Sequence, residues 1–133
     1  MTNEELEIAR AFVACSRWRW MPGMLGSNGF RIQEVRADAR GFTVVSRGIG
    51  WTAPSLQEDW LPDLNDPATL GCILRLIEDA WGLPVGMWYP KAGGCGIALG
   101  GLPVVSGRIF IAPTKAEAFL KALQAAPEVK NEL

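Results

Sequence analysis

Apolar residues near the start of the chain recur every three or four positions, which is the spacing of one face of an α-helix. Thr2, followed three residues later by Glu5, has the form of a capping box, in which each side chain binds a free backbone N–H of the other residue. We therefore predict a helix that begins near Thr2, packs on the core and ends before Pro22. The positions that form its inner stripe are Leu6, Ala9, Phe12, Val13 and Ser16.

A two-residue alternation replaces this spacing in residues 30–37 and 42–47, and alternation of this kind is typical of β-strands. The segment between them, Asp38-Ala39-Arg40-Gly41, supplies turn residues, with a glycine that can adopt a positive φ. We predict a β-hairpin here. Residues 52–66 contain Pro54 and Pro62 and show no sustained period, so they are predicted to form a connecting loop.

Two further helices have clear start signals. Asp66 stands where a helix N-cap is needed and Pro67 occupies the first helical position, where its missing N–H costs nothing. Thr114 and Glu117 repeat the capping-box pattern. The predicted inner stripes are Leu70, Ile73, Leu74, Ile77 and Trp81 in the first of these helices, closed by Gly82 and Pro84, and Ala116, Phe119, Leu120 and Leu123 in the second, closed by Pro127.

Between these two helices lie short runs with strand character, at residues 85–89, 97–99, 102–105 and 108–111. The glycines at 93, 94, 96, 100, 101 and 107 are interpreted as turns that separate them. The elements do not alternate strictly as strand and helix, so a parallel sheet is not expected. The predicted fold class is α+β, with a mostly antiparallel sheet of four to five strands and three helices packed on it.

The composition limits the class of protein, the number of domains and the cellular compartment to be expected. The chain has 133 residues, of which 49% are hydrophobic and 20% charged, values that are ordinary for a globular protein. A single domain over residues 1–133 is expected, because a chain of this length can bury one sizeable core. The N-terminal residues are polar and acidic rather than basic and apolar, and no stretch approaches the roughly 18–20 apolar residues of a membrane span. We therefore expect a cytoplasmic protein without membrane contact.

The tryptophans are the most conspicuous candidates for a binding surface. The segment Arg17-Trp18-Arg19-Trp20 alternates cations with aromatic rings, a combination that can hold phosphates and stack on bases. The simpler interpretation places the rings of Trp18 and Trp20 together in the core and both arginines in solvent, because side chains two positions apart in an extended segment share a face. The net charge of −1 also disfavours nucleic acid. As candidate residues for a protein partner we take Arg17, Trp18, Arg19, Trp60 and Trp88.

The sequence offers little for catalysis or metal binding. The chain contains no histidine, which removes the commonest general base and the usual nucleophile pairs. Its three cysteines, Cys15, Cys72 and Cys95, are far apart and form no C-x-x-C pair, so a zinc site and a disulfide framework are not expected. The glycine-rich run from residue 93 to 107 lacks the lysine and spacing of a phosphate loop. No catalytic residue, metal or cofactor is predicted.

Several segments resemble a group of small phage and prophage proteins of unknown function. They are Trp20-Met21-Pro22-Gly23-Met24, the segment from Pro62 to Cys72, Ala80-Trp81-Gly82, and Pro113-Thr114-Lys115-Ala116-Glu117-Ala118. The likeness covers most of the chain in patches and is densest from residue 62 to 82. It implies a phage or prophage setting, and thus a host bacterial cytoplasm, without implying a reaction.

Three functional hypotheses follow. The first is a non-enzymatic module that binds a protein partner. The second is a structural or assembly component that associates with copies of itself, for example as a homodimer. The third is an enzyme that depends on carboxylates or on Cys95, which stands between glycines. An exposed apolar patch larger than about 300–600 Å² would favour the first hypothesis, and a buried Cys95 would weigh against the third.

Overall fold

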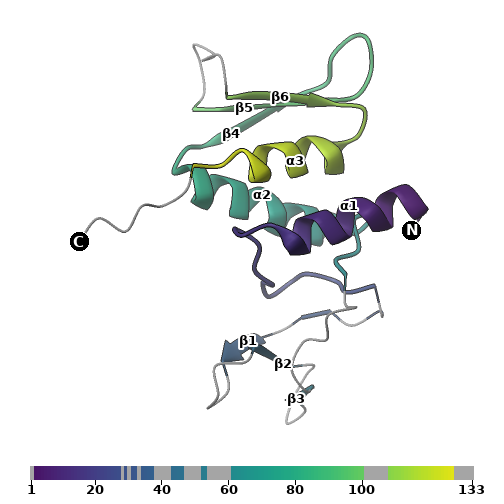
Figure 1. Cartoon of the computed structure of the whole chain (residues 1–133), viewed down its shortest axis with the longest axis vertical. Coiled ribbons are helices and arrows are strands. Elements are labelled where there is room, and N and C mark those ends of the chain that lie inside the picture. Colours follow the sequence, from purple (N-terminus) through teal and green to yellow (C-terminus); the bar gives the residue numbers. More distant parts are fainter. Residues whose placement is uncertain are drawn as a thin grey trace. The chain divides into compact units, whose positions relative to one another are not determined.

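The computed structural model describes residues 2–27, 29, 31–32, 34–37, 43–46, 52–53, 61–100 and 108–127 (Figure 1). The chain divides into two compact units. The first comprises residues 1–14 and 18–72, and the second comprises residues 15–17 and 73–133. The single domain expected from chain length stays a prediction.

Helix α1, Asn3–Ala14, opens the first unit with the predicted cap: the backbone N–H of Glu5 donates to Oγ1 of Thr2 over 3.2 Å. The helix ends before Pro22, as predicted, but at Ala14 it stops short of Ser16, the last member of the predicted stripe. The physical reason lies in Trp18 and Trp20, whose rings meet edge to face at a centroid distance of 5.5 Å. Side chains two positions apart face the same way only in an extended segment. Ala9 and Phe12 of the predicted stripe are buried, whereas Ser16, beyond the helix, is exposed.

The first unit also contains a three-stranded antiparallel sheet with the order β1-β2-β3. Strands β1, Glu34–Ala37, and β2, Thr43–Ser46, pair as the predicted hairpin, with Val35 opposite Val45. The predicted turn at residues 38–41 lies outside the described residues. Strand β3, Thr52–Ala53, corrects the prediction of a continuous loop from residue 52, since a strand of two residues is too short to produce a detectable alternation.

Helix α2, Pro67–Trp81, begins and ends as predicted and belongs to both units. At its start, the carboxylate of Asp66 accepts a hydrogen bond from the backbone N–H of Thr69 over 2.9 Å. At its end, Gly82 has a φ of +66°, a conformation that favours glycine. Of the predicted stripe Ile73 and Ile77 are buried, and the remaining members are half-buried.

The second unit is built on strands β4, Val85–Trp88, β5, Cys95–Leu99, and β6, Ile109–Ala112, which form an antiparallel sheet in the order β4-β5-β6. All five residues of β5 are buried. Strands at 85–89 and 108–111 were predicted and are confirmed with small changes in length. The interpretation of Gly96 as a turn is wrong, because Gly96 lies inside β5. The predicted strand at 102–105 lies outside the described residues.

Helix α3, Lys115–Gln124, packs against β5 and β6 and lies along one face of this sheet (Figure 1). Its cap is the predicted one, since Oγ1 of Thr114 accepts from the backbone N–H of Glu117 over 3.2 Å. The inner stripe is rotated from the prediction: Ala116 and Leu120 are only half-buried. The buried residues are Ala118, Phe119, Ala122 and Leu123. The two alanines have small side chains, which allow the helix to approach the sheet closely.

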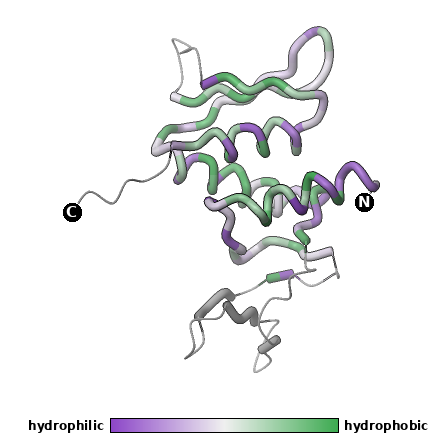
Figure 2. Tube along the Cα trace, viewed as in Figure 1, coloured by the Kyte–Doolittle hydropathy of each residue, from purple (hydrophilic) through white to green (hydrophobic). Residues whose placement is uncertain are grey.

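The α+β class, the three helices and the antiparallel pairing of the described strands are confirmed. A single sheet of four to five strands is not confirmed, because the described strands form two sheets of three. Figure 2 shows that strands β4 to β6 consist mainly of hydrophobic residues. In the described part of the chain no helix is both long and apolar enough to cross a bilayer.

Candidate functional site

The β4-β5-β6 sheet has one face covered by helices and one face that no described element of its unit covers. The covered face is identified by Phe110, whose ring lies 6.0 Å from that of Trp81 in α2. Phe110 pairs with Ile97, which pairs with Met87, so these residues share a face. Because successive side chains alternate, the neighbouring residues point to the opposite side. This uncovered face, called the outer face below, consists of Gly86, Trp88, Gly96, Ala98, Ile109 and Ile111.

Trp88 lies flat across the middle strand of the outer face. A Cβ atom added to Gly96 would stand 2.5 Å from two atoms of the indole ring of Trp88. Glycine at this position therefore makes room for the ring, and the ring in turn covers Gly96, which is buried although it is on the outer face. Trp88 keeps 37% of its surface exposed in this position.

Two isoleucines complete the outer face. Ile109 is 38% exposed and Ile111 is 52% exposed. Ile111 pairs with Gly96, which pairs with Trp88, so Ile111 and Trp88 stand two strands, or about 10 Å, apart. On the strand between them, Gly96 is covered by the ring of Trp88, and Ala98 is buried. The outer face therefore presents the ring of Trp88 on one side and the two isoleucines on the other.

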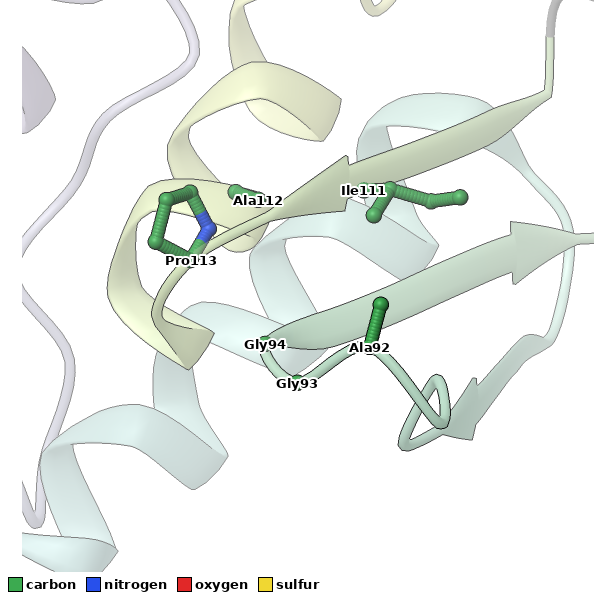
Figure 3. A pocket seen from close by; sticks show the side chains of 6 residues that line it. All are labelled: Ala92, Gly93, Gly94, Ile111, Ala112 and Pro113. Atoms are coloured by element: carbon green, nitrogen blue, oxygen red, sulfur yellow. The ribbon is translucent and has the colours of Figure 1, made fainter.

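A hollow of about 410 Å³ adjoins the outer face at Ile111 (Figure 3). Its walls are the turn at residues 92–94 and the start of the connection from β6 to α3. The lining residues are Ala92, Gly93, Gly94, Ile111, Ala112 and Pro113. None of these side chains is charged or polar, so the hollow can receive an apolar side chain and offers no ionic contact to a ligand.

The predicted binding residues lie in different surroundings. Trp88 is on the outer face, and Arg17 donates a hydrogen bond to the carbonyl oxygen of Pro127. Trp18 is half-buried and packs on Phe12, with ring centroids 5.9 Å apart, as well as on Trp20. Its Nε1 is buried without a hydrogen-bond partner among the described residues.

Arg19 is exposed, and Trp60 lies outside the described residues. Arg17 and Trp88 belong to the second unit, whereas Trp18 and Arg19 belong to the first. The contacts described above for Arg17, Trp18 and Trp88 are made with residues outside the predicted set. Ile109 and Ile111 were missed as candidates, although their alternation with Phe110 makes both faces of β6 apolar and could have drawn attention to them.

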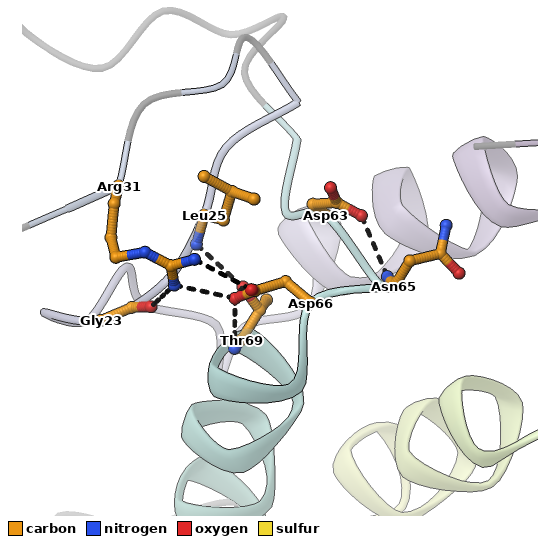
Figure 4. A network of polar contacts seen from close by, with 7 residues as sticks. All are labelled: Gly23, Leu25, Arg31, Asp63, Asn65, Asp66 and Thr69. Carbon is orange, nitrogen blue, oxygen red and sulfur yellow. Dashed lines mark hydrogen bonds and ion pairs between the residues drawn. The ribbon is translucent and has the colours of Figure 1, made fainter.

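A polar network in the first unit is a second conspicuous feature (Figure 4). The guanidinium of Arg31 donates to both carboxylate oxygens of Asp66 over 2.9 Å each, and to the carbonyl oxygen of Gly23 over 2.8 Å. The hydroxyl of Thr69, which is fully buried, donates to Asp66 and accepts from the N–H of Leu25, each over 2.8 Å.

The hydrogen bonds from Arg31, followed by those from Thr69, lower the pKa of Asp66 from 3.8 to about 2 against the opposing effect of burial. Both carboxylate oxygens are engaged by protein donors, so this carboxylate holds α2 to the preceding segments. We therefore assign the network a structural role.

The cysteines provide no reactive centre. Cys95 is 1% exposed, and burial raises the pKa of its thiol, an effect that Lys115 opposes. A raised pKa reduces the thiolate that nucleophilic chemistry requires. Cys15 and Cys72 are half-buried. Within the described ranges, no three or more Cys, Asp or Glu side chains come together in a group that could hold a metal ion.

Comparisons of the chain with protein-family models, with curated protein sequences and with solved structures found no match. The resemblance to phage and prophage proteins therefore stays a prediction from the quoted segments. The outer face and the adjoining hollow are the strongest candidate site in the described part of the chain.

Proposed function

We propose that this chain is a protein-interaction module that binds its partner through the outer face of the β4-β5-β6 sheet. One observation carries the proposal. The large hydrophobic side chains that are exposed among the described residues all belong to this sheet or to the residue that follows β4. They are Met87, Trp88, Tyr89, Ile109 and Ile111, and three of them, Trp88, Ile109 and Ile111, are on the outer face.

The exposed area of the outer face is modest. With roughly 200 Å² for a fully exposed large side chain, the exposed fractions of Trp88, Ile109 and Ile111 correspond to about 250 Å². This is just below the 300–600 Å² of the largest apolar patch on a typical monomeric protein, so the proposal depends on the adjoining hollow at Ile111 as well as on the face itself. Trp88 and Tyr89 also belong to the residue types that are enriched at protein interfaces.

The chemistry of the outer face defines the partner. None of its side chains is charged, so attraction depends on burial of apolar surface and on the fit of side chains into the hollow at Ile111. A nucleic acid would need cations to neutralise its phosphates, and the outer face has none. We infer a protein partner that presents an apolar segment, with an affinity that depends little on salt.

The setting of the proposal follows from the resemblance to small phage and prophage proteins. A module of this kind would act in a host bacterial cytoplasm and bind a protein of the phage or of the host. The proposal includes no enzymatic step, because the burial of Cys95 and its raised thiol pKa work against the cysteine chemistry considered from the sequence.

Quantitative affinity capture from a bacterial lysate tests the proposal with a double variant of the face, Ile109→Ser with Ile111→Ser. Both side chains are substantially exposed, so the variant is expected to remain folded, as circular dichroism can verify. Arg10→Ser, on the exposed side of α1, serves as the control.

At least one protein should be recovered with the wild type and with Arg10→Ser and should be lost with the double variant. Recovery of the same proteins at the same levels with all three chains would contradict the proposal.

A further inference from the structure

We propose that two copies of this chain pair through strand β4, so that the two β4-β5-β6 sheets join in one continuous antiparallel sheet. The surface used is the backbone edge of β4, which is separate from the outer face assigned to another protein. A second copy on this edge therefore adds a partner to the one proposed above.

The hydrogen-bond phase of β4 shows which backbone groups are available. The N–H of Gly100 donates to the carbonyl oxygen of Pro84 over 3.0 Å. Hydrogen-bonded pairs in an antiparallel ladder recur every second residue, so Gly86 and Trp88 direct their backbone groups to β5. The N–H and C=O groups of Val85, Met87 and Tyr89 then point away from the sheet, along an edge that contains no proline and no charge.

The opposite edge, at β6, is blocked. The N–H of Leu99 donates to the carbonyl oxygen of Arg108 over 2.9 Å, which sets the phase so that Ile109 and Ile111 direct their backbone groups outward. The ammonium group of Lys121 in α3 donates to the carbonyl oxygen of Ile111 over 3.2 Å. Charged lysines are one of the means by which proteins protect sheet edges from pairing. Strand β4 has no such protection among the described residues.

The edge of β4 is complementary to itself. In an antiparallel pair centred on Met87, the two Met87 residues stand opposite each other and Val85 stands opposite Tyr89 of the other copy. This register allows up to about six backbone hydrogen bonds. On the outer face Trp88 stands opposite Gly86 of the other copy, which has no side chain to obstruct the ring. No charge faces a like charge across the axis.

Side-chain burial favours the same pairing and limits its strength. Met87 is 36% exposed and Tyr89 is 68% exposed, although the side chain of Met87 is on the helix-covered face. Together they expose about 210 Å² per copy, if a fully exposed large side chain offers roughly 200 Å². A standard interface buries about 800 Å² per partner. The area is small by this measure, so the dimer should be reversible and its population should rise with protein concentration.

Analytical ultracentrifugation of the full chain tests the pairing with Met87→Lys and Met87→Glu. Each substitution places like charges opposite each other at the axis, and each should weaken dimerisation about tenfold or more. An equimolar mixture of the two variants should restore the dimer, because lysine then stands opposite glutamate. Ile109→Lys is the matched control, since Ile109 is 38% exposed and its backbone faces outward on the blocked edge.

Restoration in the mixture would establish the pairing, because a misfolded variant would not be rescued by the opposite charge. A wild type that stays monomeric at every concentration, or single variants that dimerise like the wild type, would overturn it. The ultracentrifugation results do not test the proposed function, which depends on affinity capture with the double variant of Ile109 and Ile111. If the double variant loses its partner but the wild type stays monomeric, only the pairing has failed. If the wild type dimerises but the double variant keeps its partner, only the proposed function has failed.

Discussion

The ion pair between Arg31 and Asp66 makes a quantitative prediction for Asp66→Asn. Asparagine is as good an N-cap as aspartate, so the variant keeps an acceptor for the start of α2 and removes mainly the charge. The pKa of Asp66 is lowered from 3.8 to about 2, and at about 1.36 kcal/mol per pKa unit this sets an upper limit of about 2.5 kcal/mol. Because Arg31 is 47% exposed, solvent screening reduces the expected loss in unfolding free energy to about 1–2 kcal/mol.

The sign of the pH dependence follows from the same pKa. The folded-state value lies below the unfolded value, so folding favours the charged carboxylate. The stabilisation from Asp66 is fully present above the unfolded pKa of 3.8, and it is lost as the pH falls towards about 2. The difference between the wild type and Asp66→Asn should therefore be largest at neutral pH and should shrink towards zero in acid.

Urea unfolding followed by circular dichroism over a pH series measures this difference. Glu7→Gln, which neutralises an exposed acid on α1, is the control and should leave the unfolding free energy at neutral pH nearly unchanged. The ion pair does not stabilise the fold in this way if Asp66→Asn matches the wild type at neutral pH, or if the difference in unfolding free energy between them stays constant into acid.

Three further predictions concern buried or strained positions. Gly93 and Gly94 have φ values of +96° and +88°, and a Cβ would meet no atom at Gly93 but would overlap a backbone carbonyl at Gly94. Gly93→Ala should therefore cost about 1 kcal/mol and Gly94→Ala clearly more in thermal or urea unfolding; equal costs would contradict the contact. Thr69→Val leaves the N–H of Leu25 without its acceptor and should cost about 1–3 kcal/mol by the same measurement, so a neutral effect would exclude this role. The thiol of Cys95 should react with a maleimide probe only after unfolding, and rapid labelling of the native protein would reopen the enzymatic hypothesis.

The helices could be predicted closely where their signals are local. The caps formed by Thr2, Asp66 and Thr114 depend on side chains within three residues of each helix start, and the structure contains all three hydrogen bonds. The end of α1 lies before Pro22, as predicted, but the helix is shorter than its predicted stripe, because its last turn depends on how Trp18 packs on Phe12 rather than on a helix-breaking residue.

The sheets were harder to predict because their pairings are distant in sequence. Gly96 looked like a turn residue, and only the ring of Trp88, brought over it from the neighbouring strand, explains a glycine inside β5. The separation of the strands into two sheets depends on tertiary contacts that alternation does not encode. For the candidate site, Trp88 was predicted from its residue type, whereas Ile109 and Ile111 could be recognised only once the covered face of β6 was known.

Site-specific photocrosslinking can show whether another protein binds the outer face in the cell. A photoreactive amino acid replaces Ile111 in one sample and Gln124, an exposed residue of α3, in the control, and both proteins are irradiated in living bacterial cells. If the outer face binds a protein, the probe at Ile111 should give a discrete adduct with another protein that the probe at Gln124 does not give. The absence of an adduct at Ile111, or the same adducts from both positions, would show that the outer face does not bind a protein.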